Sequence, residues 1–255
     1  MPDDRLRLTV VGSAPAWSLR PEQPSSCYLV ELGDDALVLD LGQGSLGCLA
    51  AIRPPESVTA IMVSHLHPDH HVDLVALRHY LKYGLAPSGS VALHAPAELR
   101  ARYDAFLGEP DFLGDLPGAE LAPGTLNVGP FSVEARPVTH ALNSFGFRVT
   151  ATGLEEGPGL VYSGDCGRWQ DLLPLTRPGD TLLSEAFWGA LPATESAGHM
   201  TAVEAATAAH QGGAARLLLT HIPEAHDPDT AAEQAGTVFG GPVALAQPGM
   251  QLVIA

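Results

Sequence analysis

Short apolar runs recur along the chain and alternate with segments rich in glycine, proline and polar residues. Runs of this length and composition predict β-strands, and the most apolar of them predict strands that are buried on both faces. The segment Gly33-Asp34-Asp35 separates two runs and predicts a hairpin turn, because glycine and aspartate tolerate positive φ. Residues 108–125 contain glycine, proline and acidic residues and predict a long loop, and residues 15–26 predict another. The predicted strands cover residues 6–11, 27–32, 36–40, 58–63, 91–93, 131–138, 145–150, 159–163, 181–184, 217–220, 243–246 and 251–254.

Helical patterns separate many of these runs. Thr201 followed by Glu204 fits a capping box, and Asp227 followed by Pro228 fits an N-cap with proline at the first helical position. No linker or repeat divides the sequence, so we expect a single α/β domain over residues 1–255, in which helices cover β-sheets. The predicted helices cover residues 45–52, 69–82 and 97–107, and two more begin at residues 201 and 227.

The composition excludes several classes of protein. Hydrophobic residues make up 45% of the 255 positions, which is too many for a disordered chain and enough for a large core. No run of about 18 apolar residues is present to span a membrane, and the start, Met1 to Arg5, lacks the apolar segment of a secretory signal. Cys27, Cys48 and Cys166 are too few for a disulfide scaffold and fit free thiols, so we expect a cytoplasmic protein.

The net charge restricts the partners. Acidic residues number 29 and basic residues 13, which gives a formal charge of −16, and Lys82 is the one lysine. This balance argues against a general binder of nucleic acids or membrane surfaces, because a phosphate backbone needs clustered cations. Bound metal ions would add positive charge that the count of side chains omits.

A cluster of potential metal ligands follows the predicted strand 58–63. His65, His67, Asp69 and His70 lie within six positions. On an extended backbone, His65 and His67 point the same way, whereas Asp69 and His70 face a second point once the chain turns toward the next helix. This arrangement suits two cations rather than one, and the mixture of imidazole and carboxylate favours zinc, with manganese, iron or cobalt as substitutes. The alternative, a polar loop with satisfied histidines, requires four suitable side chains to coincide.

Three further ligand candidates each follow a predicted buried strand. His140 follows strand 131–138, Asp165 follows strand 159–163, and His221 follows strand 217–220. A carboxylate such as Asp165 can bridge two ions with its two oxygens. Water between two such ions is acidic enough to attack a substrate at neutral pH.

The series His65-x-His67-x-Asp69-His70, then His140, Asp165 and His221, resembles the ligand series of the metallo-β-lactamase superfamily. The resemblance covers nearly the whole chain and implies a four-layer αβ/βα sandwich with the metal site at one edge between two sheets. It also implies that His65, His67 and His140 bind the first metal, that Asp69, His70 and His221 bind the second, and that Asp165 bridges them.

Three further segments are similar to the phosphodiesterase branch that includes the tRNA 3′-end endonuclease RNase Z. They are Ser144-x-Gly146-Phe147-Arg148, Leu183-Ser184-Glu185-Ala186 and Gly198-His199-Met200-Thr201-Ala202. The resemblance implies that His199 lies at the scissile phosphate, that Glu185 orients it, and that Asp69 binds metal and accepts the proton of the attacking water.

The sequence departs from the usual RNase Z pattern in two places. Residues 74–139 contain no basic inserted arm, and the segment His221-Ile222-Pro223 lacks the Ser-x-Arg that ordinarily follows the last histidine. The chain is therefore similar to the atypical cyclic nucleotide phosphodiesterases of that branch. We expect two divalent ions, Zn²⁺ or Mn²⁺, and a small phosphodiester substrate such as a cyclic nucleotide; tRNA is disfavoured by the acidic charge.

Other hypotheses about the function stay open. They are an RNase Z-type endonuclease, a lactone or thioester hydrolase of the same fold, an iron oxidoreductase, and a non-enzymatic metal-binding module with a protein partner; a homodimer is a further open point. Asp73 either hydrogen-bonds a ligand imidazole or lies on a solvated helix face. Cys166 fits a buried thiol better than a ligand. Arg148 either contacts phosphate or carries a charge at a sheet edge.

Overall fold

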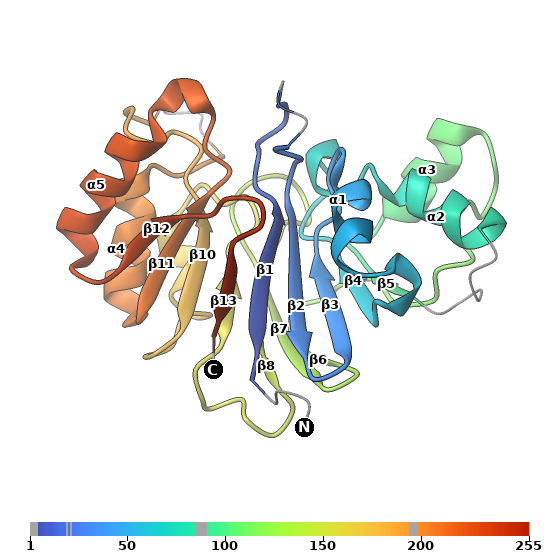
Figure 1. Ribbon diagram of the computed structural model, residues 1–255, viewed down its shortest axis with the longest axis horizontal. Coiled ribbons are helices and arrows are strands. Elements are labelled where there is room, and N and C mark those ends of the chain that lie inside the picture. The colour runs from blue at the N-terminus through green and yellow to red at the C-terminus, as the bar shows by residue number, and fades with distance from the viewer. Residues whose placement is uncertain (1–4, 19, 21, 85–90, 194–197, 255) are drawn as a thin grey trace.

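Two β-sheets form the centre of the protein (Figure 1). The computed structural model describes residues 5–18, 20, 22–84, 91–193 and 198–254. One set of strands is β1 (Arg7–Gly12), β2 (Cys27–Leu32), β3 (Asp35–Leu39), β4 (Ala60–Met62), β5 (Ala92–His94) and β13 (Gln251–Val253). The other is β6 (Gly124–Val128), β7 (Phe131–Pro137), β8 (Phe145–Ala151), β9 (Leu160–Tyr162), β10 (Thr181–Glu185), β11 (Arg216–Thr220) and β12 (Val243–Leu245). The first sheet has the order β13-β1-β2-β3-β4-β5, and the second has the order β12-β11-β10-β9-β8-β7-β6.

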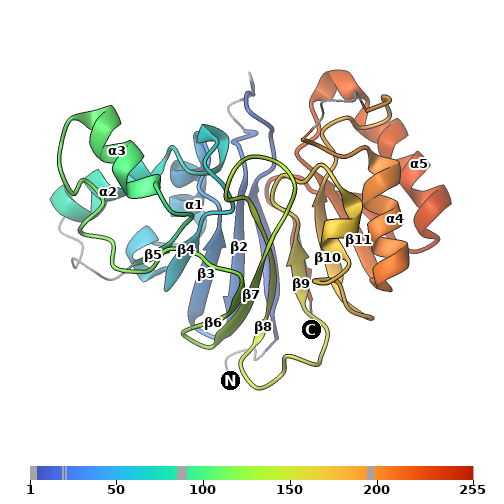
Figure 2. The same ribbon diagram turned by 180° about the vertical axis from the view of Figure 1, so that it is seen from behind.

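Helices cover the outer side of each sheet (Figure 2). The first sheet packs against α1 (Ser45–Ile52), α2 (Leu74–Tyr83) and α3 (Leu99–Leu107). The second packs against α4 (Ala202–Gly212) and α5 (Pro228–Phe239). The layers therefore run helix, sheet, sheet, helix, and the predicted four-layer αβ/βα sandwich is confirmed.

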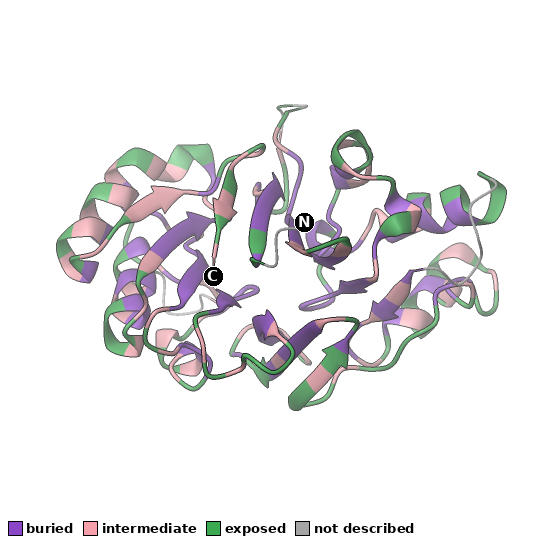
Figure 3. Ribbon diagram, turned by 60° about the horizontal axis from the view of Figure 1, so that its bottom comes forward, coloured by how far each residue is buried: buried purple, intermediate pink, exposed green. Residues whose placement is uncertain are grey.

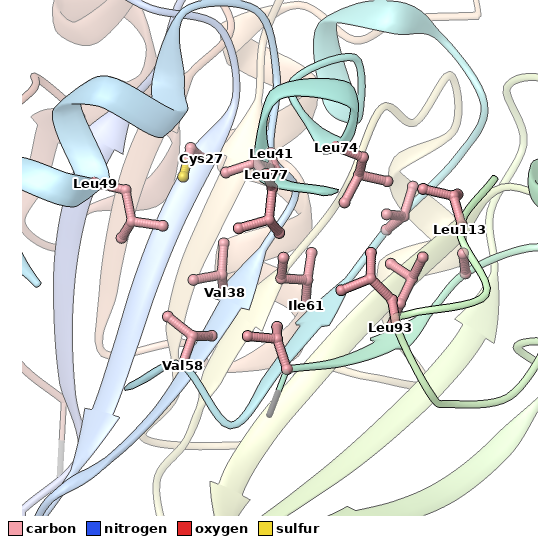
Figure 4. Close-up of a cluster of buried hydrophobic side chains, with 14 of the residues drawn as sticks. Cys27, Val38, Leu41, Leu49, Val58, Ile61, Leu74, Leu77, Leu93 and Leu113 are labelled. Atoms are coloured by element: carbon pink, nitrogen blue, oxygen red, sulfur yellow. The ribbon is translucent and has the colours of Figure 1, made fainter. Parts of the chain in front are cut away.

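The central strands are buried on both faces, as the purple strand segments in Figure 3 show. In β3, Leu37 and Leu39 belong to the apolar cluster between the two sheets, together with Phe147 of the second sheet. Val38 lies on the opposite face and packs in the cluster that includes Leu77 of α2 (Figure 4). Successive side chains of a strand project to opposite faces, so burial on both faces explains why these strands read as continuous apolar runs.

Both predicted helix caps are confirmed. The Thr201 side chain accepts a hydrogen bond from the backbone N–H of Glu204, and the Glu204 side chain accepts one from the backbone N–H of Thr201. Asp227 accepts from the N–H of Thr230 at the start of α5, with Pro228 at the first helical position. These local hydrogen bonds satisfy N–H groups that the helices leave unpaired.

Two predicted boundaries differ in the structure. The hairpin turn between β2 and β3 has two residues, Gly33 and Asp34, rather than three. Gly33 alone of the turn takes a positive φ, of 60°. The helix predicted to begin at residue 69 begins at Leu74, and Pro68–His70 forms a separate 3-10 turn. His71 has a φ of −152°, which a continuous helix cannot accommodate.

The prediction of a loop over residues 108–125 is wrong at its end, because β6 begins at Gly124. This strand lies at the outer edge of the second sheet and buries Val128 while its neighbours remain largely exposed. So weak an apolar alternation gives little signal in the sequence. The predicted loop 15–26 is confirmed where it is described; residues 19 and 21 lie outside the described residues.

The described helices include none that is long and apolar enough to cross a membrane. Cys27, Cys48 and Cys166 are free, as predicted from their number.

Arg148 has neither of the two roles that its sequence position suggested. It lies on β8, between β7 and β9 rather than at a sheet edge, and only 2% of its surface is exposed. Its guanidinium donates to both oxygens of Asp180, from Nε at 2.8 Å and from Nη2 at 2.9 Å, and its Nη1 donates to the carbonyl of Glu155 at 2.8 Å. Arg148 is therefore a buried structural residue that ties β8 to the segment before β10.

This buried pair generates a prediction about stability. Arg148→Ala leaves the Asp180 carboxylate buried without its main partner, which typically costs about 3–5 kcal/mol. Arg136→Ala is the matched control, since Arg136 is half exposed and pairs with Glu134 at the surface, where a pair contributes about 0–1 kcal/mol. The measurement is the free energy of unfolding in urea. Equal losses in the two variants would contradict the structural role of Arg148.

Candidate metal centre

All seven predicted ligands meet at one edge of the sandwich. The first sheet supplies His65, His67, Asp69 and His70 from the segment that follows β4. The second sheet supplies His140 after β7, Asp165 after β9 and His221 after β11. Since β7, β9 and β11 run in the same direction, their carboxyl ends lie along one edge of that sheet.

The first ligand group consists of His65, His67, His140 and Asp165. His65 Nε2 lies 3.1 Å from His67 Nδ1, and His140 Nε2 lies 2.9 Å from the same atom. Asp165 Oδ2 is 3.6 Å from both His65 Nε2 and His140 Nε2. Three imidazole nitrogens and one carboxylate oxygen thus converge on one point, the donor set that suits a zinc-like ion.

The second ligand group consists of Asp69, His70, His221 and again Asp165. Asp69 Oδ2 lies 3.1 Å from His221 Nε2 and 3.4 Å from His70 Nε2. Asp165 Oδ1 lies 3.3 Å from His70 Nε2 and 3.6 Å from His221 Nε2. The two oxygens of Asp165 therefore face different groups, which is the geometry expected of a bridging carboxylate.

The polar atoms of this centre fit divalent cations. His70 Nε2 and Asp165 Oδ1 are buried and have no hydrogen bond from any described residue, a state that costs free energy unless another partner is supplied. Burial lowers the pKa of His140 to about 4 and lowers the pKa of His65 and His67 as well. These imidazoles are consequently neutral near pH 7 and offer lone pairs to a cation.

The second group also requires positive charge. Burial alone would lower the pKa of His70, but the carboxylates of Asp165 and Asp40 raise it well above its ordinary value. A cation beside these carboxylates, whether a proton on His70 or a metal ion, offsets their charge.

Asp40 is the partner that orients His70, and sequence reasoning missed this role. Its carboxylate accepts hydrogen bonds from His70 Nδ1 at 2.7 Å, from the Tyr162 hydroxyl at 2.6 Å, and from Ser64 through the backbone N–H at 2.6 Å and the hydroxyl at 2.7 Å. A proton on Nδ1 of His70 leaves Nε2 free to face the ligand group. The one signal was the acidic residue that ends an apolar strand, Val38-Leu39-Asp40.

Asp73 and Cys166 have other roles. Asp73 accepts hydrogen bonds from the backbone N–H groups of Gly44 and Leu46 at the start of α1. Both predictions for Asp73, a hydrogen bond to a ligand imidazole and a place on a solvated helix face, are therefore wrong. Cys166 is buried and its thiol donates to the carbonyl of Arg168. Burial raises the pKa of the Cys166 thiol, which disfavours the thiolate that a metal ligand requires.

His199 and Glu185 lie beside the ligand groups. His199 Nδ1 is 3.1 Å from Glu185 Oε1 and 3.8 Å from Asp165 Oδ2. The same Glu185 carboxylate accepts from the backbone N–H groups of Cys166, Met200 and Phe187, which fixes its position. The Phe187 ring stacks on the His199 imidazole with centroids 4.6 Å apart, and sequence reasoning had not indicated this contact.

The comparisons with known proteins agree with the observed fold. A family model described as "Beta-lactamase superfamily domain" matches residues 38–222. The chain belongs to the β-lactamase superfamily and has the metallo-β-lactamase fold of metal-dependent hydrolases.

Relatives over nearly the full length support this assignment. An uncharacterized protein of Mycobacterium tuberculosis is 36% identical over 248 residues, which is 93% of this chain and 88% of that protein. The crystal structure of the metallo-β-lactamase fold protein YhfI from Bacillus subtilis has a TM-score of 0.85 at 27% identity and covers 98% of this chain and all of that one. A ribonuclease Z of Myxococcus xanthus is 25% identical over 94% of this chain and 95% of that protein.

The hydrogen bonds of Asp40 generate a testable prediction. In Asp40→Asn one oxygen is replaced by an NH₂ group that confronts donors from His70, Tyr162 or Ser64. Leaving such buried groups unpaired costs about 1–3 kcal/mol each, so the free energy of unfolding in denaturant should fall by at least that amount. Asp34→Asn makes the same chemical change in the exposed hairpin turn and should have little effect. Wild-type stability in Asp40→Asn would show that the carboxylate is not needed.

Proposed function

We propose that the protein hydrolyses small phosphodiesters, such as a cyclic nucleotide, with two divalent cations, Zn²⁺ or alternatively Mn²⁺. The observation that carries the proposal is the His199–Glu185 pair beside an aspartate, Asp165, that faces two ligand groups at once. Metal-assisted hydrolysis in general requires only the metal ligands. A nearby imidazole held by a carboxylate adds a proton donor for a poor leaving group.

The ligand groups define which residues would hold the ions. His65, His67 and His140 would hold one, Asp69, His70 and His221 the other, and Asp165 both. Bound there, two divalent ions would neutralise charge on a phosphate and lower the pKa of a water molecule.

The remaining steps fall to side chains of the chain. Burial would lower the pKa of His199, but the hydrogen bond to Glu185 and the charges of Glu185 and Asp165 raise it. His199 is thus suited to protonate or stabilise the leaving oxygen from Nε2, while Nδ1 stays bonded to Glu185. Asp69, beside His221, would accept a proton from the attacking water.

A small substrate is favoured by the electrostatics of the chain. The formal charge of −16 opposes a tRNA-sized polyanion, and 13 basic residues are available in the whole sequence. One phosphodiester carries a single charge, which two cations and His199 can balance locally.

Metal content provides the first test. We expect two divalent ions per chain in the purified protein and the loss of both metal and activity in Asp165→Ala, since Asp165 touches both groups. The fold should survive, because a core of this size does not depend on the ligands. Metal analysis, turnover and circular dichroism measure the three quantities, with Asp229→Ala on the exposed start of α5 as control. Full metal occupancy in Asp165→Ala would exclude the bridging role.

The leaving group provides the second test. His199→Ala should retain both metals and lose activity by roughly 10²–10⁴-fold on a cyclic nucleotide, whose ribose alkoxide leaves badly. An aryl phosphodiester leaves as a stable phenolate, so its rate should fall least. His79→Ala, on the exposed side of α2, should leave both rates unchanged. Small and equal losses on both substrates in His199→Ala would reject the catalytic role of His199.

An RNase Z-type endonuclease is the second candidate, because relatives with that name align over most of the chain. The deciding quantity is kcat/KM for a cyclic nucleotide against a precursor tRNA at the same salt concentration. We expect the cyclic nucleotide to be preferred. A tenfold preference for the tRNA, about 1.4 kcal/mol of transition-state stabilisation, would decide for the second candidate. A lactone and a thioester in the same panel test the remaining hydrolase activities.

A further inference from the structure

A pocket of 560 Å³ opens beside the ligand groups, between the loop that joins β1 to β2 and the segment that follows β11. Its volume lies in the range of about 300–1,000 Å³ that is typical of small-molecule sites. Trp17 and Gln23 line it from the first segment, and Ile222 and Pro223 line it from the second. His221 also lines it, so the pocket and the second ligand group share a residue.

The loop that carries Trp17 is fixed at its base. The N–H groups of Ser13 and Ala14 both donate to the carbonyl of Pro24 at 3.0 Å, which brings the two ends of the loop together. The N–H of His221 donates to the carbonyl of Ser13 at 3.1 Å. Gly12 permits the close approach, because a Cβ there would lie 2.0 Å from the carbonyl oxygen of Ser25. The position of the pocket relative to His221 is therefore set by backbone hydrogen bonds.

Trp17 is exposed although it is one of three tryptophans in the chain. Its exposed fraction is 58%, it is a lining residue of the pocket, and it belongs to none of the hydrophobic clusters of the described residues. An indole in this position offers a flat apolar face to a planar ring. Gln23 and Gln247 add amide donors and acceptors to the lining, which suit the polar edge of a heteroaromatic ring.

The charges in the lining favour an uncharged group. Apart from His221, the charged residues among the described lining residues are Arg20 and Glu224, and they form an ion pair with each other. The described lining residues consequently offer no unpaired cation to a second phosphate, as the next nucleotide of a polynucleotide would require.

We infer that this pocket binds the base of a single nucleoside, stacked on Trp17, while the phosphodiester lies at the ligand groups beside His221. The inference rests on the proposed function and narrows it to mononucleotide diesters. Trp17 is a binding residue that contacts the base and takes no part in the chemistry. Stacking of this kind contributes about 1–3 kcal/mol per base, and uniform binding of substrate and transition state changes KM rather than kcat.

The experiment compares two diesters that differ only in the base: 3′,5′-cyclic AMP, and the 3′,5′-cyclic phosphate of methyl riboside. Trp17→Ala should raise KM for cyclic AMP about 5- to 150-fold with kcat nearly unchanged, and should leave KM for the methyl riboside unchanged. Trp17→Phe should restore most of the loss. Phe106→Ala, an exposed aromatic on α3, controls for surface truncation. An equal change on both diesters, or none on cyclic AMP, would overturn the assignment.

A binding measurement keeps this inference separate from the proposed function. Equilibrium dialysis of AMP against the metal-loaded protein reports on the pocket whether or not either diester is hydrolysed. If the wild-type protein hydrolyses neither diester, the proposed function fails, while weaker AMP binding in Trp17→Ala than in Trp17→Phe would still support the pocket. AMP binding that is the same in the wild type and in Trp17→Ala would overturn it.

Discussion

The buried carboxylate of Asp40 is the interaction on which the rest of the site depends. A carboxylate between two sheets is costly unless it is surrounded by donors, and here it is surrounded by donors from the segment after β4 and from β9. Satisfying this single charge joins the two sheets at one edge and fixes the ring of His70. Asp40 takes a φ of 59°, an unusual conformation for a residue other than glycine. This conformation ends β3 as its carboxylate turns into the interior.

The ligand groups follow from the same packing. Asp165 is buried between the two groups and presents one oxygen to each, so both groups depend on this one carboxylate. His221 has the same backbone conformation as Asp40: it directly follows the last residue of β11 and has a φ of 60°. Residues held in such conformations at a site persist because the surrounding structure determines them. The positions of Asp40 and His221 are therefore determined by the packing around them, while His67 is exposed and the pocket borders His221.

The ligands that lie close together in the sequence could be recognised from the sequence alone. The spacing from His65 to His70 is local and could be recognised directly, whereas the fold and the convergence of His140, Asp165 and His221 on this segment were implied by the resemblance to the metallo-β-lactamase superfamily. The partners of Asp40, Asp73 and Arg148 could not be predicted, because each is brought close by packing of segments far apart in the chain. Asp73 adjoins the ligand segment and yet caps α1, and Arg148 reaches Asp180 across the second sheet. The edge strand β6 was missed for a different reason, since an edge needs little apolar surface.

The pairing of β1 with β13 has a consequence for how the protein folds. Arg7 lies opposite Val253, so strands from opposite ends of the sequence are neighbours in the first sheet. Contacts of such long sequence separation form late and slow the folding rate, because loop-closure entropy opposes them. During synthesis, one edge of β1 stays unpaired until β13 leaves the ribosome, and unpaired edges invite association with other chains. Completion of the first sheet therefore requires β13, the last strand in chain order.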